Sequence, residues 1–445
     1  MVVSLDTLRA DHLHCYGYSR ETSPRLDEFA AESVLFEETI AESSWTLPTH
    51  VTMFTGLSQN VHGVGFGRHR LAAEAVTLAE ALRSAGYRTK GVWSGPFLHG
   101  FFGLDQGFEP GDYYGYVGET CYDDASLDVT DESALAKIKA THDESHRTVT
   151  SAQISDDGIR FLDEVREGRA AGADTRPFFL FLHYFDIHAD YIPPEKDAAP
   201  FLADLPPGGN DVEAKRNETI ARYDGEIRFT DRHLGRFLDA LKASGLDENT
   251  IVLITSDHGE EFLDHGKYGH NATLYDEVLR VPLLIRAPDA VRGLRVRAPA
   301  RHADIMPTIL DLAGVPVPSP ITGESLAPVV RGAEMAKERA AVARLRLGAN
   351  HDLVAIRHRG KKFIRRRRPE GVDIELFDLV RDGQERSPLT GEEAKRFTER
   401  FEERLQAIEA YEVGVAARLS LGDEADADIP PHLKKALEEL GYLDG

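Results

Sequence analysis

Ile251-Val-Leu-Ile-Thr-Ser-Asp-His-Gly-Glu-Glu261 is the stretch of sequence that decides the fold. Its first residues are apolar, as in a parallel strand that is buried on both faces, and the run ends on Asp257 and His258. In an open α/β sheet, ligands bind beyond the carboxyl ends of the strands. We therefore expect an α/β fold in which Asp257 and His258 bind a metal ion at one edge of the sheet.

The first residues of the chain repeat this arrangement. Val2-Val-Ser-Leu5 is a short apolar run that ends on Asp6. Two strand-end carboxylates far apart in sequence can bind one divalent cation if their strands are neighbours. An imidazole among the ligands favours manganese or zinc over calcium, because calcium prefers oxygen donors. The sequence therefore predicts one metal site that includes Asp6, Asp257 and His258.

Strand-like runs alternate with amphipathic segments along the first 330 residues, which is typical of a mostly parallel central sheet with helices on both faces. The expected strands are 2–5, 91–93, 178–183, 250–255 and 282–285, and the expected helices include 24–32, 78–84 and 218–241. The polar segment 111–147 is expected to form part of the rim of the site. Short β-like runs at 341–345, 353–356 and 362–366, then helices at 392–410 and 431–440, predict a smaller C-terminal α+β unit over residues 331–445, after a catalytic domain over residues 1–330.

The composition narrows the range of partners. Lys and Arg number 52 against 75 Asp and Glu, so the net charge of -23 argues against nucleic acid. Cys15 and Cys121 offer no disulfide framework. No apolar stretch reaches the roughly 18 residues of a membrane helix. A cytoplasmic location and, if a leader was removed, a periplasmic or secreted one both fit this sequence, and the oligomeric state stays open.

Ser43-Ser-Trp-Thr-Leu-Pro-Thr-His-Val-Thr-Met-Phe-Thr-Gly56 predicts a helix that Pro48 opens and Gly56 closes. Thr46 would lie just before this helix, where unpaired N–H groups and the helix dipole favour an anion such as phosphate or sulfate. A threonine hydroxyl becomes an effective nucleophile when a divalent cation binds it as an alkoxide. Thr46 is therefore the candidate nucleophile and a further metal ligand, with a plain helix N-cap as the alternative.

Histidines cluster after two of the expected strands. In Phe178–Pro194, His188 is the candidate substrate contact, whereas His183 is expected to be a packed strand residue and Asp190 a carboxylate at the rim. The candidate substrate ligands on the loop after the metal strand are His265, Lys267 and His270.

Together these segments resemble the sulfatase family of the alkaline phosphatase superfamily. Leu5–Asp11 is similar to the first metal strand of the family, Thr46–Gly56 to its nucleophile segment, and Ser256–Glu260 with Leu274–Leu283 to its second metal strand and the segment that follows. Asp304–Gly314 and Glu375–Asp382 are similar to later signatures, the second in a small C-terminal domain. The resemblance implies a metal held by Asp6, Asp257 and His258 and a covalent intermediate on the nucleophile, with His188 and basic loop residues binding the anion.

The chain departs from the family pattern at the nucleophile. Usual sulfatases oxidise a Cys, sometimes a Ser, to formylglycine within Cys-x-Pro-Ser-Arg, whereas this chain has Thr46-Leu-Pro-Thr-His50. Formylglycine cannot form from Thr, and His50 takes the place of the Arg as a candidate substrate ligand. Thr7 stands for a metal-binding Asp, and His258 for an Asn, which moves the expected metal from calcium toward manganese or zinc.

Two further comparisons with the family concern the anion and the metal count. His270, with Lys267 nearby, replaces a Lys that follows the second metal strand. The two-zinc members of the superfamily hold one metal with a set similar to Asp6, Thr46, Asp257 and His258. A second metal is left open, because the spacing of its potential ligands does not match the usual Asp-x-x-x-His pair; those ligands are Asp186, His188, His265 and His270.

A threonine ester must be cleaved by water at sulfur or phosphorus, and phosphothreonine intermediates are normal for the phosphatases and phosphodiesterases of the superfamily. We therefore expect metal-dependent hydrolysis of a small anionic phosphate mono- or diester through Thr46, with His188 or His270 as the acid that protonates the leaving group. The alternatives are a sulfatase that works without formylglycine, a catalytically weak anion-binding protein, and a phosphoethanolamine-type transferase.

Overall fold

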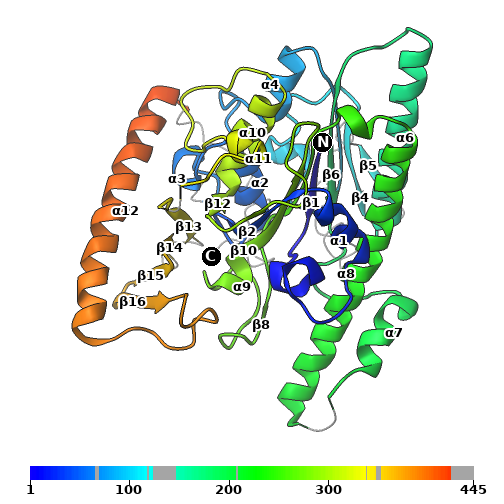
Figure 1. The fold of residues 1–445 in the computed structure, drawn as a ribbon. Helices are drawn as coiled ribbons and strands as arrows, with labels where there is room; N and C mark the ends of the chain where they lie inside the picture. Colours follow the sequence, from blue (N-terminus) through cyan, green and yellow to red (C-terminus); the bar gives the residue numbers. More distant parts are fainter. Residues whose placement is uncertain are drawn as a thin grey trace, which may run out of the picture.

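A central sheet of ten strands organises the computed structural model, which describes residues 1–65, 70–117, 120–123, 147–206, 209–336, 338–346 and 352–421 (Figure 1). The strand order is β11-β2-β10-β7-β1-β6-β3-β4-β5, and β12 also pairs with β2. The strands are β1 (Val2–Leu5), β2 (Val34–Ile40), β3 (Arg88–Ser94), β4 (Tyr113–Val117), β5 (Thr120–Asp123), β6 (Phe178–Tyr184), β7 (Val252–Ser256), β10 (Arg280–Arg286), β11 (Arg295–Val296) and β12 (Ala300–Arg301).

The two strands that end on the predicted metal ligands lie side by side in this sheet. β1 pairs in parallel with β7 on one side and with β6 on the other. β10 is antiparallel to both β7 and β2, and β5 is antiparallel to β4. The mostly parallel sheet predicted from the sequence is thus confirmed, and Asp6 and Asp257 leave adjacent strands at the same edge.

Helices cover both faces of the sheet, as Figure 1 shows. α1, α6 and α8 pack on one face with Val3 and Leu5 of β1, and α2, α4 and α10 pack on the other with Val2. The helices are α1 (Pro24–Ala31), α2 (Thr46–Thr55), α3 (Gln59–His62), α4 (Leu78–Ser84), α6 (Ser151–Ala170), α7 (Glu195–Ala203), α8 (Asp211–Ala243), α9 (Asp276–Leu279), α10 (Ile305–Leu312), α11 (Ala327–Val330) and α12 (Gly391–Leu419). Alternate residues of a strand point to opposite faces, which is why one short strand contributes to both cores.

Two parts of the sheet differ from the prediction. β2 has Glu37 and Glu38 in its middle, so its sequence shows no continuous apolar run, yet it pairs with β10 across a register shift. Segment 111–147 was expected to be an irregular rim, but it begins with β4 and β5, which extend the sheet beyond β3. Residues 118–119 and 124–146 lie outside the described residues, so the predicted rim stays a prediction.

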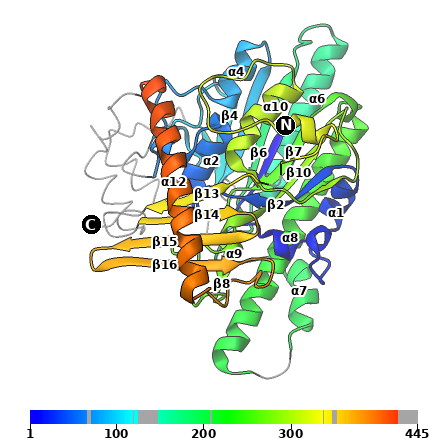
Figure 2. The same ribbon diagram turned by 60° about the vertical axis from the view of Figure 1, so that its left-hand side comes forward.

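The C-terminal part forms a second, antiparallel sheet. Its strands are β13 (Ala341–Arg346), β14 (Asp352–His358), β15 (Lys361–Arg368) and β16 (Gly371–Asp378), paired in that order. One face packs against the region of β2, α9 and β10, and α12 lies across the other face (Figure 2). The boundary near residue 330 stays a prediction, and the expected helix 431–440 lies outside the described residues.

A two-stranded ribbon, β8 (Glu261–Phe262) and β9 (Tyr268–Gly269), follows the metal strand and carries the predicted loop ligands. In the part of the chain that the structure describes, none of the helices has both the length and the apolar character needed to span a bilayer.

Candidate active site

The predicted metal ligands meet at the carboxyl ends of β1 and β7. Asp6 follows β1 directly, Asp257 follows β7 directly, and both side chains are buried. Ligand atoms of Asp6, Asp257 and His258 all lie within 4.8 Å of one another. Two strand ends that are about 250 residues apart in the sequence thus form one cluster.

The carboxylates of this cluster fit a divalent cation. Both oxygens of Asp6, and Oδ2 of Asp257, are buried without a hydrogen-bond partner among the described residues. Oδ1 of Asp257 accepts bonds from the backbone N–H groups of Thr7 (3.1 Å) and His258 (2.8 Å). Burial raises the pKa of Asp6, and the negative charge of Asp257 raises it further. Buried carboxylates without partners are costly, and a bound cation supplies the missing positive charge.

His258 presents a free nitrogen to the same point. Its Nδ1 lies 2.9 Å from the carbonyl oxygen of Gly259. A carbonyl only accepts hydrogen bonds, so Nδ1 carries the proton and Nε2 keeps its lone pair. Nε2 lies 3.5 Å from Asp257 Oδ2 and 3.9 Å from Asp6 Oδ1. This is how proteins fix the tautomer of a metal-binding histidine.

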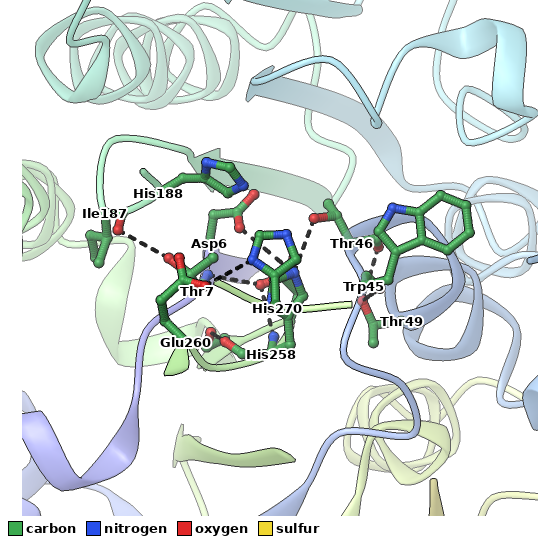
Figure 3. A network of polar contacts seen from close by, with 12 residues as sticks. Asp6, Thr7, Trp45, Thr46, Thr49, Ile187, His188, His258, Glu260 and His270 are labelled. Carbon is green, nitrogen blue, oxygen red and sulfur yellow. Dashed lines mark hydrogen bonds and ion pairs between the residues drawn. The ribbon is translucent and has the colours of Figure 1, made fainter. Parts of the chain in front are cut away.

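Thr46 reaches the cluster from the start of α2 (Figure 3). It is the first residue of the helix rather than the N-cap, which is Trp45. Gly56 ends the helix at φ 64°, a left-handed conformation that glycine adopts without strain. The Thr46 hydroxyl lies 3.2 Å from His258 Nε2, to which it can donate its proton. The candidate nucleophile thus lies beside the candidate metal ligands.

His270 and His188 lie next to His258. The ring centroid of His270 is 4.4 Å from that of His258 and 5.0 Å from that of His188 (Figure 3). His270 Nδ1 lies 3.0 Å from Oε1 of the buried Glu260, and the Tyr191 hydroxyl donates to Oε2 of the same carboxylate at 2.8 Å. Glu260 therefore orients His270 so that its Nε2 is available for proton transfer.

Three of the predicted substrate ligands differ from His188 and His270 in their contacts. His50 is fully buried, with Nδ1 2.8 Å from the Thr46 carbonyl oxygen and Nε2 2.9 Å from the Ser4 hydroxyl. His265 contacts Glu277 (2.6 Å) and the carbonyl oxygen of Glu385 (3.0 Å). Lys267 is exposed on the turn between β8 and β9. Their roles in binding stay predictions.

Three residues at the site were not predicted from the sequence. His183 is the sixth residue of β6, and its Nε2 lies 3.4 Å from Asp6 Oδ2, so it is more than a packed strand residue. Glu260 orients His270. His302 lies next to the end of β7, with its Nε2 3.0 Å from the Ser256 carbonyl oxygen. Burial lowers the pKa of His50 to about 3 and that of His183 to about 4, so both rings are neutral at pH 7. His183 lies in an otherwise apolar run. The sequence signal that could have identified it was a polar residue in a central strand, close to the carboxyl end of that strand.

Thr7 has backbone strain next to the cluster. Its φ of 53° is left-handed, which is rare for a β-branched residue. Its hydroxyl donates to the Ile187 carbonyl oxygen (3.0 Å), and its own carbonyl accepts from the Tyr223 hydroxyl (2.7 Å). The side chain that replaces the family aspartate is therefore engaged away from Asp6 and Asp257. Such strain is common at functional sites, where surrounding contacts maintain it.

Comparison with known proteins identifies a family that the chain matches. The family model described as "Sulfatase" matches residues 1–315, and that described as "N-sulphoglucosamine sulphohydrolase, C-terminal" matches residues 264–411. The uncharacterized sulfatase YidJ of Escherichia coli is 27% identical over 73% of this chain and 70% of its own length. The ulvan-active sulfatase of Formosa agariphila is 27% identical over 87% of this chain and 76% of its own length.

Solved structures share the fold at low identity. A structure of BT4656 in complex with its substrate D-glucosamine-2-N,6-O-disulfate has a TM-score of 0.74 and 19% identity, with 96% of this chain and 99% of that chain covered. The phosphonate monoester hydrolase of Agrobacterium radiobacter has a TM-score of 0.71 and 23% identity, with 92% and 95% covered.

These comparisons contradict the expectation of a phosphate ester substrate. Most of the similar proteins are sulfatases, and a minority of the similar proteins are phosphonate monoester hydrolases. The expectation was wrong because it depended on the nucleophile alone. A hydroxyl can attack sulfur as well as phosphorus in line, so Thr46 does not select between them.

The alternative of a sulfate ester agrees better with these relatives. The "Sulfatase" model covers the strands that carry Asp6, Asp257 and His258, and it spans most of the chain. The chain therefore belongs to the sulfatase family of divalent-metal-dependent hydrolases.

Proposed function

We propose that this protein hydrolyses a sulfate ester of a carbohydrate, with Thr46 as the nucleophile and without formylglycine. The observation that carries the proposal is the position of the Thr46 hydroxyl, 3.2 Å from His258 Nε2 in a buried cluster with Asp6 and Asp257. The relatives support the substrate class, because they include an ulvan-active sulfatase, an N-acetylglucosamine-6-O-sulfatase and a protein solved with a glucosamine disulfate.

The metal-binding residues in this proposal are Asp6, Asp257, His258 and Thr46. When bound there, a divalent cation would supply positive charge that lowers the pKa of the Thr46 hydroxyl and balances an anionic ester. The nitrogen ligand of His258 favours manganese or zinc, whereas calcium is usual at sites whose ligands are all oxygen atoms. The identity of the ion is therefore part of the proposal.

The proposed reaction has two displacements at sulfur. Thr46, whose hydroxyl proton would be lost to water when the cation binds, attacks sulfur as the alkoxide; the bond from sulfur to the sugar oxygen breaks, and protonated His270 gives its proton to that leaving oxygen. Water then attacks the sulfur of the threonine sulfate while His270 takes one of its protons, so that hydrogen sulfate is released and Thr46 leaves as the alkoxide. His188, half-buried and next to His270, is in position to bind the sulfate oxygens.

The first test measures sulfate release. Protein loaded separately with manganese, zinc and calcium is incubated with glucosamine 6-O-sulfate, a sulfated oligosaccharide and an aryl sulfate, and sulfate is measured by ion chromatography. The matching phosphate esters are assayed in parallel. We expect sulfate release with at least one metal. Phosphate release without sulfate release would refute the proposal, and binding of the sulfated sugars without turnover would support an anion-binding protein instead.

The second test addresses the nucleophile. Thr46→Ala should lower kcat by at least about 1,000-fold, because removing a covalent nucleophile costs several kcal/mol of transition-state stabilisation. Thr55→Ala is the matched control, since its hydroxyl lies on the same helix but donates to the Val51 carbonyl oxygen. Mass spectrometry of quenched wild-type protein should find one added sulfo group on the peptide that contains Thr46. Wild-type turnover in Thr46→Ala would exclude Thr46 as the nucleophile.

A further inference from the structure

A second group of potential metal ligands lies beside the first. Ligand atoms of His50, His183 and Asp257 are all within 4.8 Å of one another, and all three side chains are buried. Asp257 belongs to this group and also to the cluster with Asp6 and His258. Asp6 faces both groups, because its Oδ1 lies 3.9 Å from His258 Nε2 and its Oδ2 lies 3.4 Å from His183 Nε2.

His183 is held as a ligand would be. Its Nδ1 lies 2.8 Å from the Ser94 carbonyl oxygen, so Nδ1 carries the proton and the lone pair is on Nε2. Nε2 is buried and has no hydrogen-bond partner among the described residues. His258 is fixed in the same way by the Gly259 carbonyl oxygen. Both imidazoles therefore direct an unprotonated nitrogen at the pair of carboxylates, the arrangement that backbone carbonyls impose on metal-binding histidines.

His50 can become a ligand if its Nδ1 gives up the hydrogen bond to the Thr46 carbonyl oxygen. Its Nδ1 lies 3.9 Å from Asp257 Oδ2 and 2.8 Å from the Thr46 carbonyl oxygen, to which Nδ1–H donates when no cation is present. Its Nε2 lies 2.9 Å from the Ser4 hydroxyl, which can accept as well as donate. A cation beside Nδ1 would move the ring proton to Nε2, where Ser4 accepts it.

We propose that the protein binds a second divalent cation between His50, His183 and Asp257, with Asp257 shared by the two cations. Two imidazoles and a carboxylate make zinc the expected ion. The ligands differ from those expected for a second metal from the sequence, since Asp186 accepts four hydrogen bonds from Thr150 and Ser151 instead. Paired cations in hydrolases typically lie about 3.5–4 Å apart, a separation that shared carboxylates allow.

Two bound cations would outweigh the negative charge of the site. Asp6 and Asp257, when ionised, contribute two negative charges against the four positive charges of two divalent cations. The remaining positive charge would favour an anionic ester. The inference rests on the proposed first site, so its test must distinguish failure of one site from failure of both.

The test counts bound zinc. Chelated protein is titrated with zinc by calorimetry, and the metal that remains after gel filtration is measured by mass spectrometry. We expect two ions per chain for the wild type, one for His183→Ala and one for His258→Ala, and at least a tenfold loss of affinity at both sites for Asp257→Asn. The control is His62→Asn, which removes a buried histidine of α3 outside both groups and should keep two ions. Thermal unfolding of each variant checks that it is folded.

A second readout begins with the wild-type protein, so its first result does not depend on the fold of a variant. Wild-type protein with two manganese ions should give the electron paramagnetic resonance spectrum of a coupled pair, and His183→Ala that of a single ion. One ion in both wild type and His183→Ala would overturn the second site and leave the first intact. No bound ion in the wild type would remove both sites and the metal basis of the proposed function. Two ions in His183→Ala would place the second ion elsewhere and also overturn the inference.

Discussion

At the scale of single residues, the site depends on which buried polar atoms have partners. Asp6, Asp257 and His183 have buried atoms without a hydrogen-bond partner among the described residues, whereas Glu260 is bonded to Tyr191 and His270. A buried polar atom without a partner costs about 1–3 kcal/mol. The unpartnered atoms of Asp6, Asp257 and His183 lie close together, so one or two bound cations would satisfy all three side chains.

The role of Glu260 leads to a prediction about catalysis. Glu260→Gln should lower kcat about 10-fold to 100-fold and leave KM nearly unchanged, because the amide no longer fixes the His270 tautomer. The measurement is kcat and KM for the sulfate ester. Tyr191→Phe keeps the carboxylate and should lower kcat much less, and an unchanged kcat in Glu260→Gln would mean that Glu260 is only structural.

At the scale of elements, the ribbon β8–β9 connects the site to the C-terminal sheet. His265, between these strands, stacks on Tyr275 with ring centroids 3.6 Å apart, and it bridges Glu277 and Glu385. Burial alone would lower the pKa of His265, but the hydrogen bond and negative charge of Glu277 outweigh it, and the pKa is raised above its usual value. The protonated ring thus holds the ribbon against the segment after β16.

This raised pKa predicts a stability change with pH. The native state binds the proton more tightly than the unfolded chain, so the contribution of His265 is fully present below its unfolded pKa of about 6.5 and is lost as the pH rises through the folded pKa. Urea unfolding of wild type and His265→Gln at several pH values should show a stability difference that shrinks with rising pH. In a Glu277→Gln background this pH dependence should nearly vanish; if it persists, another group causes it.

At the scale of the whole molecule, the second sheet is joined to the region of α9 and β10 by buried ion pairs as well as apolar contacts. Lys362 is 1% exposed, and its Nζ lies 2.8 Å from Asp276 Oδ1 and 2.8 Å from Glu385 Oε1. Arg357 also pairs with Asp276. The apolar cluster that surrounds them joins α9 and β10 to β13 and β14. Removing one partner of a buried pair leaves an uncompensated charge.

Lys362→Met should therefore lower the free energy of unfolding by about 3–5 kcal/mol. The control is Lys395→Met, because Lys395 is exposed on α12 and its pair with Glu392 should contribute at most about 0.5 kcal/mol. Urea titration followed by circular dichroism measures both. A loss below about 1 kcal/mol for Lys362→Met would mean that apolar packing alone holds the second sheet in place.

The sequence by itself determined the sheet class and the metal strands. Apolar runs that end abruptly on Asp6 and on Asp257 are local patterns, and a strand buried on both faces must be apolar along its length, so these strands were predicted nearly to the residue. The helix of this segment was also predicted, with its end at Gly56, but it begins at Thr46, two residues before Pro48. Strand β2 was missed, since Glu37 and Glu38 interrupt its apolar pattern and its pairing with β10, β11 and β12 depends on distant segments.

Only the tertiary structure decided which polar residues share the site. His183 and His265 look alike in sequence as histidines near strand ends, yet one faces Asp6 and the other faces the C-terminal sheet. His50 and His183 meet at Asp257 because β6 pairs with β1 while His50 of α2 contacts Ser4 of the same strand, a relation between segments more than 100 residues apart. Local patterns specify elements, whereas distances between side chains depend on the register and packing of the whole sheet, which no single stretch of sequence contains.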